Sequence, residues 1–404
     1  MQTFFNNEYL QTKQGREADR ILRSCVHCGF CTATCPTFLL TGNELDSPRG
    51  RIYLIKTMLE GNNVSRITQT HLDRCLTCQS CETACPSGVQ YHRLLDLGRN
   101  HIEQRIGRSP LAAIQRFIMR KLFTTGWLFA SALGLGRLFR PLLPTALKKQ
   151  IPPMVNPGKW PDFQGPRRML LLNGCVQNHL SPNTNAAAAR VLSRLGIQVI
   201  TMAEEGCCGA VSYHLNAQEE GLAQARRQVD RLLAHLDDGV EAIISTASGC
   251  GNFTKGYVQL LAQDEHYAAR AQRLAAYIRD ISEILQAEDL TQLQPVRPQR
   301  LAFHCPCSLQ HGQHLTGAVD SILRQLNITL TAVKDAHLCC GSAGTYSILQ
   351  PQLAKQLRHN KITALEAGSP DAIATANIGC QSYLGMVTDK PVRHWIEFVD
   401  DLFI

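Results

Sequence analysis

Apolar residues in the first quarter of the chain recur at helical spacing. Residues 51–60 and 91–98 have the composition or spacing of helices, and proline and glycine residues interrupt these stretches. Residues 21–105 show little strand pattern, and residues 1–20 form a loose polar lead-in. The pattern predicts a small helical domain over residues 21–105.

The pattern changes after Arg167, where short apolar runs alternate with longer helical segments. Residues 169–172 and 301–303 are strand-like, whereas residues 216–236 have the spacing of a helix. Such alternation is typical of βα units around a parallel sheet. We therefore predict an α/β region after the helical domain.

This α/β region contains an internal repeat. Three pairs of segments match at offsets of 130 to 132 residues: 192–197 with 323–328, 207–209 with 339–341, and 242–243 with 372–373. A common offset at three places indicates two copies of one structural unit. We assign these copies, named CCG repeats after the sequence Cys-Cys-Gly, to residues 166–290 and 291–404. The predicted fold class is thus multidomain α and α/β, a helical domain followed by two tandem α/β CCG repeats.

Residues 106–165, between these regions, combine apolar and basic side chains and end in a proline-rich loop. No acidic residue lies between Glu103 and Asp162, whereas ten Lys and Arg residues do. The longest uncharged run, residues 122–136, has 15 residues, and a membrane-spanning helix needs about 20. We interpret the segment as a linker that is either a docking surface for a membrane or partner, or a pair of helices packed on the body.

The overall composition is that of a globular protein with a localised positive charge. The chain has 404 residues, of which 44% are hydrophobic and 18% charged, and a net charge of +8. Because the ten clustered cations exceed this net charge, the remainder is slightly acidic, which argues against nucleic-acid binding. The N-terminus lacks the apolar core of a signal peptide, so we expect a reducing cytoplasmic location in which the 17 cysteines stay available as metal ligands.

Two copies of the motif C-x2-C-x2-C-x3-C-P lie in the helical domain. The first consists of Cys25, Cys28, Cys31 and Cys35, and the second of Cys75, Cys78, Cys81 and Cys85. In two-cluster ferredoxins the fourth cysteine of each run ligates the other cluster. The motif therefore predicts one [4Fe–4S] cluster on Cys25, Cys28, Cys31 and Cys85, and a second on Cys75, Cys78, Cys81 and Cys35. Structural zinc is the alternative, but zinc requires neither the third spacing nor the trailing proline.

Three stretches of sequence resemble the iron–sulfur subunits of glycolate oxidases: CVHCGFCTATCP, ELDSPRGRIYLIK and RCLTCQSCETACPSGVQYHRLLDLGR. The order of the CCG repeats that follow is similar as well. The resemblance implies an electron-transfer subunit that works with FAD-containing glycolate oxidase subunits and passes electrons to a respiratory acceptor such as quinone. It also implies peripheral association with the inner face of the cell membrane.

Each CCG repeat carries four cysteines in the same order. They are Cys175, Cys207, Cys208 and Cys250 in the first repeat, and Cys307, Cys339, Cys340 and Cys380 in the second. Related cysteine-rich domains hold a further cluster on such motifs, usually with a final C-x2-C that is incomplete here. The resemblance implies one or two additional iron–sulfur clusters. Buried structural thiols, or a redox-active vicinal pair without iron, are the alternatives.

Motifs for binding a nucleotide or flavin are not evident in the sequence. There is no G-x-G-x-x-G after a strand and no G-x-x-x-x-G-K-[ST] loop. We therefore predict no catalytic residue, and we expect the chain alone not to oxidise an organic substrate. The alternatives are an iron–sulfur subunit of a related dehydrogenase for lactate or glycerol-3-phosphate, and a heterodisulfide-reductase-like thiol–disulfide catalyst.

Overall fold

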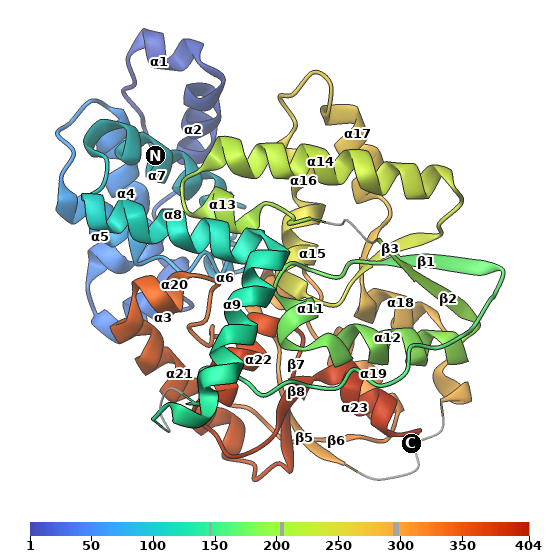
Figure 1. Cartoon of the computed structure of the whole chain (residues 1–404). Helices are drawn as coiled ribbons and strands as arrows, with labels where there is room; N and C mark the ends of the chain where they lie inside the picture. The colour runs from blue at the N-terminus through green and yellow to red at the C-terminus, as the bar shows by residue number, and fades with distance from the viewer. Residues whose placement is uncertain (145–147, 203–205, 294–298, 404) are drawn as a thin grey trace. The chain divides into compact units, whose positions relative to one another are not determined.

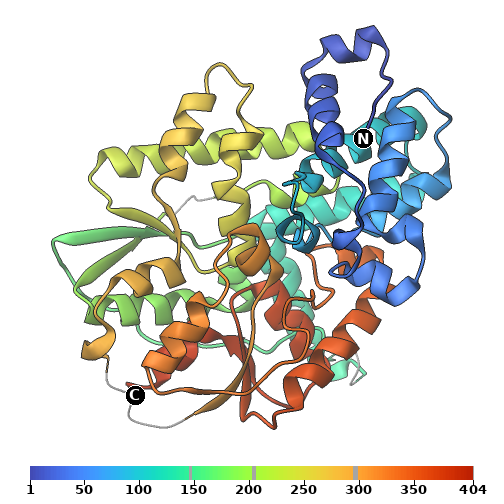
Figure 2. The same cartoon turned by 180° about the vertical axis from the view of Figure 1, so that it is seen from behind.

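The computed structural model describes residues 1–144, 148–202, 206–293 and 299–403, drawn in two opposite views in Figures 1 and 2. Two compact units make up the chain. The first unit consists of Met1–Phe117 and His337–Lys361, and the second of Ile118–Ala336 and Ile362–Ile404. Each unit has its own hydrophobic core.

The N-terminal part of the first unit is helical, as the sequence predicts. Its helices are α1 (Asn7–Gln11), α2 (Lys13–Ser24), α3 (Pro36–Thr41), α4 (Pro48–Leu59), α5 (Arg66–Asp73), α6 (Ser80–Thr83) and α7 (Tyr91–Ile106). Helices α4 and α7 confirm the helices predicted over residues 51–60 and 91–98. They approach closely because Gly98 has no side chain, since a Cβ there would lie 2.7 Å from Cγ1 of the fully buried Ile55.

The start of helix α4 is fixed by its local sequence. The hydroxyl of Ser47 accepts a hydrogen bond from the Gly50 amide at 3.0 Å, and Pro48 occupies the first helical turn, where a missing amide hydrogen costs nothing. One face of α4 buries Ile52 and Ile55 in the core of the first unit. The same helix also buries a charged residue, Arg51, which is 1% exposed.

The second unit contains two four-stranded sheets with the same strand order. They are β2-β1-β3-β4 and β6-β5-β7-β8, and all their strand pairs are parallel. The strands are β1 (Arg167–Leu171), β2 (Ile197–Thr201), β3 (Ala242–Ser245), β4 (Ile278–Asp280), β5 (Arg300–His304), β6 (Thr329–Leu330), β7 (Ala372–Thr375) and β8 (Val392–His394). The predicted α/β fold class and its internal repeat are thus confirmed.

Helices follow the strands in both repeats. After β1 come α11 (Gln177–Leu180), α12 (Pro182–Arg194), α13 (Ala210–His214), α14 (Gln218–Asp237), α15 (Ser248–Lys255), α16 (Tyr257–Leu260), α17 (Ala268–Ala275) and α18 (Ile281–Ala287). After β5 come α19 (Ala318–Gln325), α20 (Tyr346–Leu349), α21 (Pro351–Glu366), α22 (Ile378–Gly385) and α23 (Trp395–Asp401). Short 3-10 or π turns are η1 (Phe30–Thr32), η2 (Glu44–Asp46), η3 (Arg140–Leu142), η4 (Leu290–Gln292) and η5 (Ser308–Gly312).

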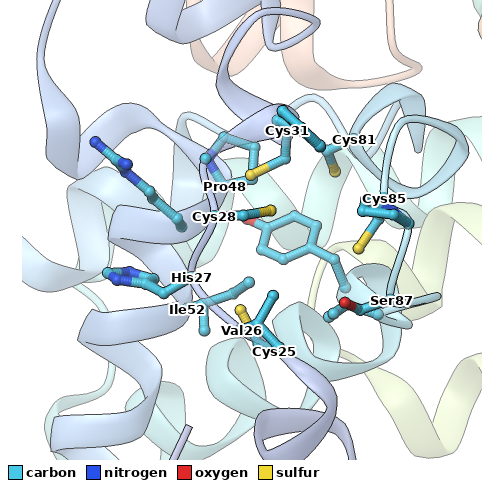
Figure 3. Close-up of a pocket in the computed structure, with 16 residues that line it drawn as sticks. Cys25, Val26, His27, Cys28, Cys31, Pro48, Ile52, Cys81, Cys85 and Ser87 are labelled. Atoms are coloured by element: carbon cyan, nitrogen blue, oxygen red, sulfur yellow. The ribbon is translucent and has the colours of Figure 1, made fainter.

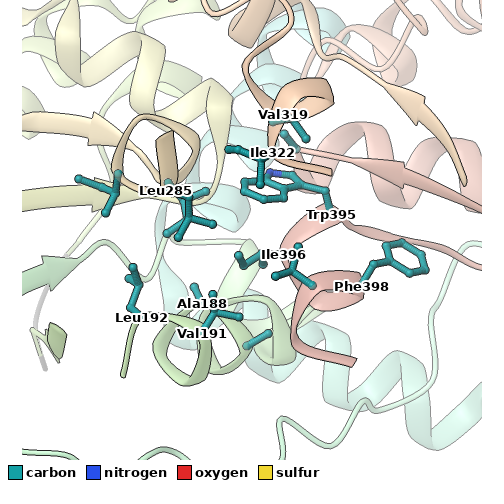
Figure 4. Packing of buried hydrophobic residues seen from close by; sticks show 14 of the residues in the cluster. Ala188, Val191, Leu192, Leu285, Val319, Ile322, Trp395, Ile396 and Phe398 are labelled. Atoms are coloured by element: carbon teal, nitrogen blue, oxygen red, sulfur yellow. The ribbon is translucent and has the colours of Figure 1, made fainter. Parts of the chain in front are cut away.

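Each face of the first sheet is covered by helices. Apolar side chains of α14 pack on one face, and those of α12 and α18 pack on the other. Figure 1 shows α14 on one side of this sheet and α12 on the other. The second face belongs to a cluster that also includes both α19 and α23, so one core joins the two repeats. Figure 4 shows Trp395 and Ile396 of α23 in this cluster beside Val191 of α12 and Ile322 of α19.

The predicted linker folds into the helices α8 (Pro110–Thr124) and α9 (Gly126–Phe139). Among the described residues no single helix is long and apolar enough to cross a bilayer. Helix α8 and the segment Gly126–Leu142 reach that length and composition only together, and they are bent by 98° at their junction. The linker therefore contains the pair of helices that one of the two interpretations predicted. Its role as a docking surface stays a prediction.

Candidate metal centres

Five cysteines from both motifs line one solvent-open cavity in the first unit, whose empty space totals about 430 Å³. One of them, Cys81, also lines a second cavity. Cys25, Cys28 and Cys31 come from the loop after α2, and Cys85 comes from the loop after α6. Figure 3 shows their sulfur atoms around one space. We call this space the first cavity. Its three clustered thiols and one distant thiol are the donor set that a [4Fe–4S] cluster needs.

A second cavity of about 390 Å³ lies in the same unit. It is lined by Cys75, Cys78 and Cys81 of the second motif and by Cys35 of the first. The similar sizes of the two cavities suit two groups of the same kind. Cys81 and the buried Tyr91 line both cavities, so the two spaces share a wall.

The two cysteine loops have the same backbone conformation. The residues two and four positions after the first cysteine have positive φ angles in both loops: His27 (59°) and Gly29 (87°) in one, Thr77 (53°) and Gln79 (61°) in the other. These left-handed residues turn the chain tightly around the space between the thiols. After the fourth cysteine of the first loop, Pro36 begins helix α3. Repetition of this geometry explains why the motif spacing is repeated.

A buried group of charged residues lies beside the second cavity. The carboxylate of Asp46, which is fully buried, accepts from Nη2 of Arg51 at 3.4 Å and from Nη1 of Arg74 at 3.0 Å, and it lies 2.9 Å from Nδ1 of His71. Arg51 also donates to the His71 carbonyl at 2.7 Å. A buried charge needs such partners, because desolvation without them is costly.

Burial changes the acidity of the thiols around the cavities. It raises the pKa of the Cys31 thiol to about 11, and it raises the pKa of Cys81 well above its usual range. Thiolates, not thiols, bind metal, so iron must displace protons from these two groups. Loading of the cavities is therefore linked to pH.

The four cysteines of the first CCG repeat lie close together in the second unit. Cys175 follows β1, the pair Cys207 and Cys208 follows β2, and Cys250 lies in α15 after β3. Carboxyl ends of parallel strands meet at one edge of a sheet, where ligands bind in open α/β folds. The Sγ atoms of Cys175 and Cys207 are 3.6 Å apart. The side chain of Cys208 contacts those of Cys207 and Cys250.

The vicinal pair of this repeat is held by a strained turn. Gly209 has a φ of 100°, and a Cβ on it would lie 2.6 Å from the Gly221 carbonyl oxygen, which confirms that this glycine is needed for the turn. Its amide donates to the Cys207 sulfur at 3.5 Å. Hydrogen bonds from Cys175 and Cys208 lower the pKa of Cys207 well below its usual range. Cys207 is therefore the sulfur of this group most readily present as a thiolate.

The cysteines of the second CCG repeat are divided between the two units. Cys305, Cys307 and Cys380 belong to the second unit, and Cys339 and Cys340 belong to the first. Around the pair, the geometry of the first repeat recurs: Gly341 has a φ of 86°, and its amide donates to the Cys339 sulfur at 3.4 Å. Cys339 and Cys340 are buried.

The donor sets and their loops define an iron–sulfur protein. Residues 21–89 match the model of the 4Fe-4S dicluster domain, and residues 169–255 and 301–385 each match the model of the cysteine-rich domain. The dicluster match favours two [4Fe–4S] clusters over the zinc alternative. The chain belongs to the family of glycolate oxidase iron–sulfur subunits, as comparison with known proteins shows.

The similarity to members of that family extends over most of the chain. The glycolate oxidase iron-sulfur subunit of Escherichia coli (strain K12) is 53% identical over 401 residues, which cover 99% of this chain and 98% of that protein. A probable glycolate oxidase iron-sulfur subunit of Bacillus subtilis (strain 168) is 30% identical over 89% of this chain and 87% of its own length. Lactate utilization protein A of Bacillus velezensis is 25% identical over 54% of this chain and 90% of its own length.

Some residues around the cavities carry no motif and were missed by sequence reasoning. They are Thr37, Asp46, Arg51 and Tyr91, which line the second cavity or contact residues that do. One signal was available, because Arg51 precedes the apolar residues 52–55 within a predicted helix and interrupts its buried face. A cation at such a position needs a buried partner, which sequence spacing alone does not identify.

Proposed function

We propose that this chain is the electron-transfer subunit of a glycolate oxidase complex, in which it carries electrons from a flavin-containing partner to a respiratory acceptor, quinone. The observation that carries the proposal is the arrangement of eight cysteines around two adjacent cavities. Each cavity is lined by three cysteines of one motif and by at least one cysteine of the other, and Cys81 lines both. Family membership supplies the substrate, since the relatives' names refer to glycolate.

The chain's own residues hold and separate the two redox centres. Cys25, Cys28, Cys31 and Cys85 would ligate the cluster of the first cavity, and Cys75, Cys78, Cys81 and Cys35 that of the second. When bound, the clusters supply one-electron exchange, which a flavin can match by giving up its two electrons singly. The shared wall of Cys81 and Tyr91 keeps the two centres adjacent.

Access to the two cavities differs, and this suggests where electrons enter or leave. Cys28 of the first cavity is exposed, whereas Cys35 and Cys81 of the second are buried. Val26 and Phe30, which flank Cys28, are 68% and 65% exposed. These apolar side chains suit contact with a protein partner, because they leave an unfavourable apolar surface in water.

Quinone reduction by the purified complex tests this function. Cys85→Ser in the full chain should leave glycolate-dependent flavin reduction intact and abolish most electron transfer to a quinone analogue. Cys305→Ser is the matched control, since Cys305 belongs to none of the predicted ligand sets, and it should behave like the parent. Replacing glycolate with lactate or glycerol-3-phosphate tests the substrate. Equal quinone reduction by Cys85→Ser and by the parent would contradict the proposal.

We further propose that the complex is cytoplasmic and bound peripherally to the inner face of the membrane, with α9 as a contact. Trp127, Leu138 and Leu142 in or next to this helix are 72%, 72% and 81% exposed. Three nearby cations, Arg120, Lys121 and Arg140, form contacts with other residues of the chain. Arg120 and Lys121 contact Glu220 at 3.4 and 3.2 Å, and Arg140 donates to the Ile151 carbonyl at 2.9 Å.

Because these cations already have partners within the chain, we expect the exposed apolar side chains of α9, and not the cations, to make the main contact with the membrane. The double variant Trp127→Ser, Leu138→Ser should release the complex from vesicles, and Lys121→Gln should release less of it. Flotation with vesicles of anionic and of neutral lipid measures both. Unchanged binding of the double variant would remove α9 from the proposal.

The first CCG repeat is the better candidate for an additional iron–sulfur cluster, and the second repeat is a further one. In the first, the contacts of Cys175 with Cys207 and of Cys208 with Cys250 bring all four sulfurs into one group. In the second, Cys307, Cys339, Cys340 and Cys380 are the proposed ligands. Iron analysis of Cys207→Ser full-length protein should show a loss of about four irons per chain relative to the parent. An unchanged iron content would leave the repeat as a structural module.

A further inference from the structure

The residues around the second cavity differ from those around the first in charge and hydrogen bonding. Arg51 lines the second cavity and is 1% exposed. Arginine stays protonated at any pH that the protein tolerates. Its charge acts through a water-free interior, where an electrostatic interaction is far stronger than at the surface. The positive charge of Arg51 therefore stabilises a group in the second cavity when that group gains negative charge.

Neighbouring charges do not cancel that of Arg51. Asp46 carries one negative charge and contacts two cations, Arg51 and Arg74. A third, the buried Arg99, donates to the carbonyl oxygens of Leu72 and Cys75 at 2.8 and 2.9 Å. Arg51 and Arg99 thus donate to carbonyl oxygens of residues 71–75, a segment that itself includes Arg74. His92, which also lines this cavity, is paired with Glu82 at 2.8 Å.

Arg51 also acts through Thr37 on a ligand of the cavity. Its Nη1 and Nη2 donate to Oγ1 of Thr37 at 3.2 and 3.1 Å. The Thr37 hydroxyl donates to the Asp46 carbonyl oxygen at 3.0 Å and lies 3.3 Å from Sγ of Cys35. A ligated Cys35 has no proton, so only the hydroxyl can donate between the two atoms. The anionic sulfur is a stronger acceptor than the neutral carbonyl.

No buried cation comparable to Arg51 is found among the described residues that line the first cavity. Its arginine is Arg49, whose side chain is 37% exposed and is paired with Glu44. The Glu44 carboxylate offsets the charge of Arg49, and water screens the remainder. Cys28 on this side is exposed as well.

We propose that Arg51 and Thr37 make the reduction potential of the cluster in the second cavity more positive than that of the cluster in the first. The inference rests on the proposed ligation of both cavities. Positive charge and hydrogen bonds to ligand sulfurs raise cluster potentials, since one-electron reduction adds one negative charge. The first electron supplied to the chain therefore resides in the second cavity, away from the exposed Cys28.

A redox titration monitored by paramagnetic resonance tests this on the full-length, anaerobically purified chain, with dithionite as the reductant. Cys28→Ser identifies the signal of the first cavity, because it alters that signal alone. In the parent, the unaltered signal should appear first as the potential is lowered. Arg51→Gln should move the midpoint of that signal to more negative potential and narrow or invert its separation from the other. Arg49→Gln, the matched control, should leave the midpoint of the second-cavity signal unchanged.

Thr37→Val provides a second variant that keeps the charge of Arg51 and nearly preserves side-chain shape. It should move the midpoint of the second-cavity signal in the same direction by a smaller amount. Arg51→Lys keeps the positive charge, so its midpoint should lie closer to the parent's than that of Arg51→Gln. If Thr37→Val and Arg51→Gln retain both signals at the parent's midpoints, the inference is overturned while the proposed function stands. A parent protein without iron or paramagnetic signals would overturn both.

Discussion

The cysteines of the helical region and those of the first CCG repeat are brought together by different means. In the helical region, seven of the eight cysteines lie on loops and short turns, and Cys81 lies in the four-residue helix α6. Residues of α3, α4 and α6 line the cavities that these cysteines surround. In the CCG repeat, four cysteines lie beyond the ends of strands that contribute fully buried side chains, such as Leu170 and Ile244. In the first case the thiols and the cavities between them occupy part of a small apolar core, and in the second the apolar core positions the thiols.

The difference predicts that bound metal stabilises the fold of the helical region, whereas the CCG repeats fold without metal. Without ligated iron, the thiols around the two cavities have no group to hold them together, whereas the sheets of the CCG repeats keep their cores. Each fully buried Leu or Ile contributes about 1.5–3 kcal/mol irrespective of metal. Metal binding energy is folding energy where a site has no other support.

Iron removal should therefore have the largest effect, and it should be confined to the helical region. Treatment with a chelator under reducing conditions should remove most hydrogen-exchange protection from α3, α4 and α6. Amides of β1, β3, β5 and β7 should stay protected. Exchange measured by mass spectrometry on the full chain reports both regions at once. Equal loss in the sheets would show that the CCG repeats depend on metal as well.

Crossed ligation predicts the next largest effect. Cys35→Ser should damage the cluster held by Cys75, Cys78 and Cys81, although Cys35 belongs to the other motif. Cys85→Ser should do the converse. Paramagnetic resonance of the two reduced variants distinguishes the clusters, with Cys305→Ser as the control. Damage to the cluster of the variant's own motif would show that each run binds its cluster alone.

The core of the CCG repeats should respond to acid through a buried histidine. Burial lowers the pKa of His394 to about 4; Nε2 lies 2.8 Å from the Thr246 carbonyl oxygen, and Nδ1 accepts the Ile396 amide at 3.2 Å. The neutral ring is therefore the form that the fold holds. Between the unfolded value of about 6.5 and the folded value of about 4, the unfolded state binds more protons, so stability falls as pH falls through that window.

The expected loss is up to about 3 kcal/mol at pH 4, and none is expected from this group above pH 7. Urea denaturation followed by the far-ultraviolet signal at several pH values measures it. The variant His394→Asn keeps a capping oxygen for α23 and should show a flatter profile in that range. An equally steep profile in the variant would assign the acid sensitivity to other groups.

The smallest effect concerns the loading of the cavities. Because burial raises the pKa of Cys31 to about 11, its thiol is protonated at neutral pH, and reconstitution with iron and sulfide should be faster at pH 9 than at pH 7. The rise of iron–sulfur absorbance with time measures the rate. A rate that is constant across this range would show that deprotonation of buried thiols does not limit loading.

Sequence patterns identified the parts of this molecule that local spacing encodes. The cysteine motifs, the helices α4 and α7, and the strands of the two repeats follow from residues near one another in the chain. The surroundings of the second cavity do not, because Thr37, Asp46, Arg51 and His71 meet only through tertiary packing. The docking surface was predicted from apolar and basic residues that share one segment, and their spacing could not reveal that Arg120 and Lys121 contact Glu220.

The predicted domain boundaries are another case in which the sequence leaves a question open. The internal repeat placed residues 291–404 together, and residues 337–361 cluster with the N-terminal helices in the structure. This segment includes the second vicinal pair and Tyr346, whose hydroxyl donates to the Arg74 carbonyl at 3.1 Å. Such a contact between residues 272 positions apart leaves no trace in local periodicity.

The central claim, that this chain accepts electrons that originate from glycolate, is tested most directly by paramagnetic resonance of the anaerobic complex with the proposed flavin-containing partner. After glycolate is added without an acceptor, the account predicts reduced iron–sulfur signals from the two cavities, together with reduced flavin. The same sample with Cys85→Ser should lose the signal of the first cavity. A reduced flavin beside clusters that stay oxidised, at potentials that dithionite shows to be accessible, would contradict the claim.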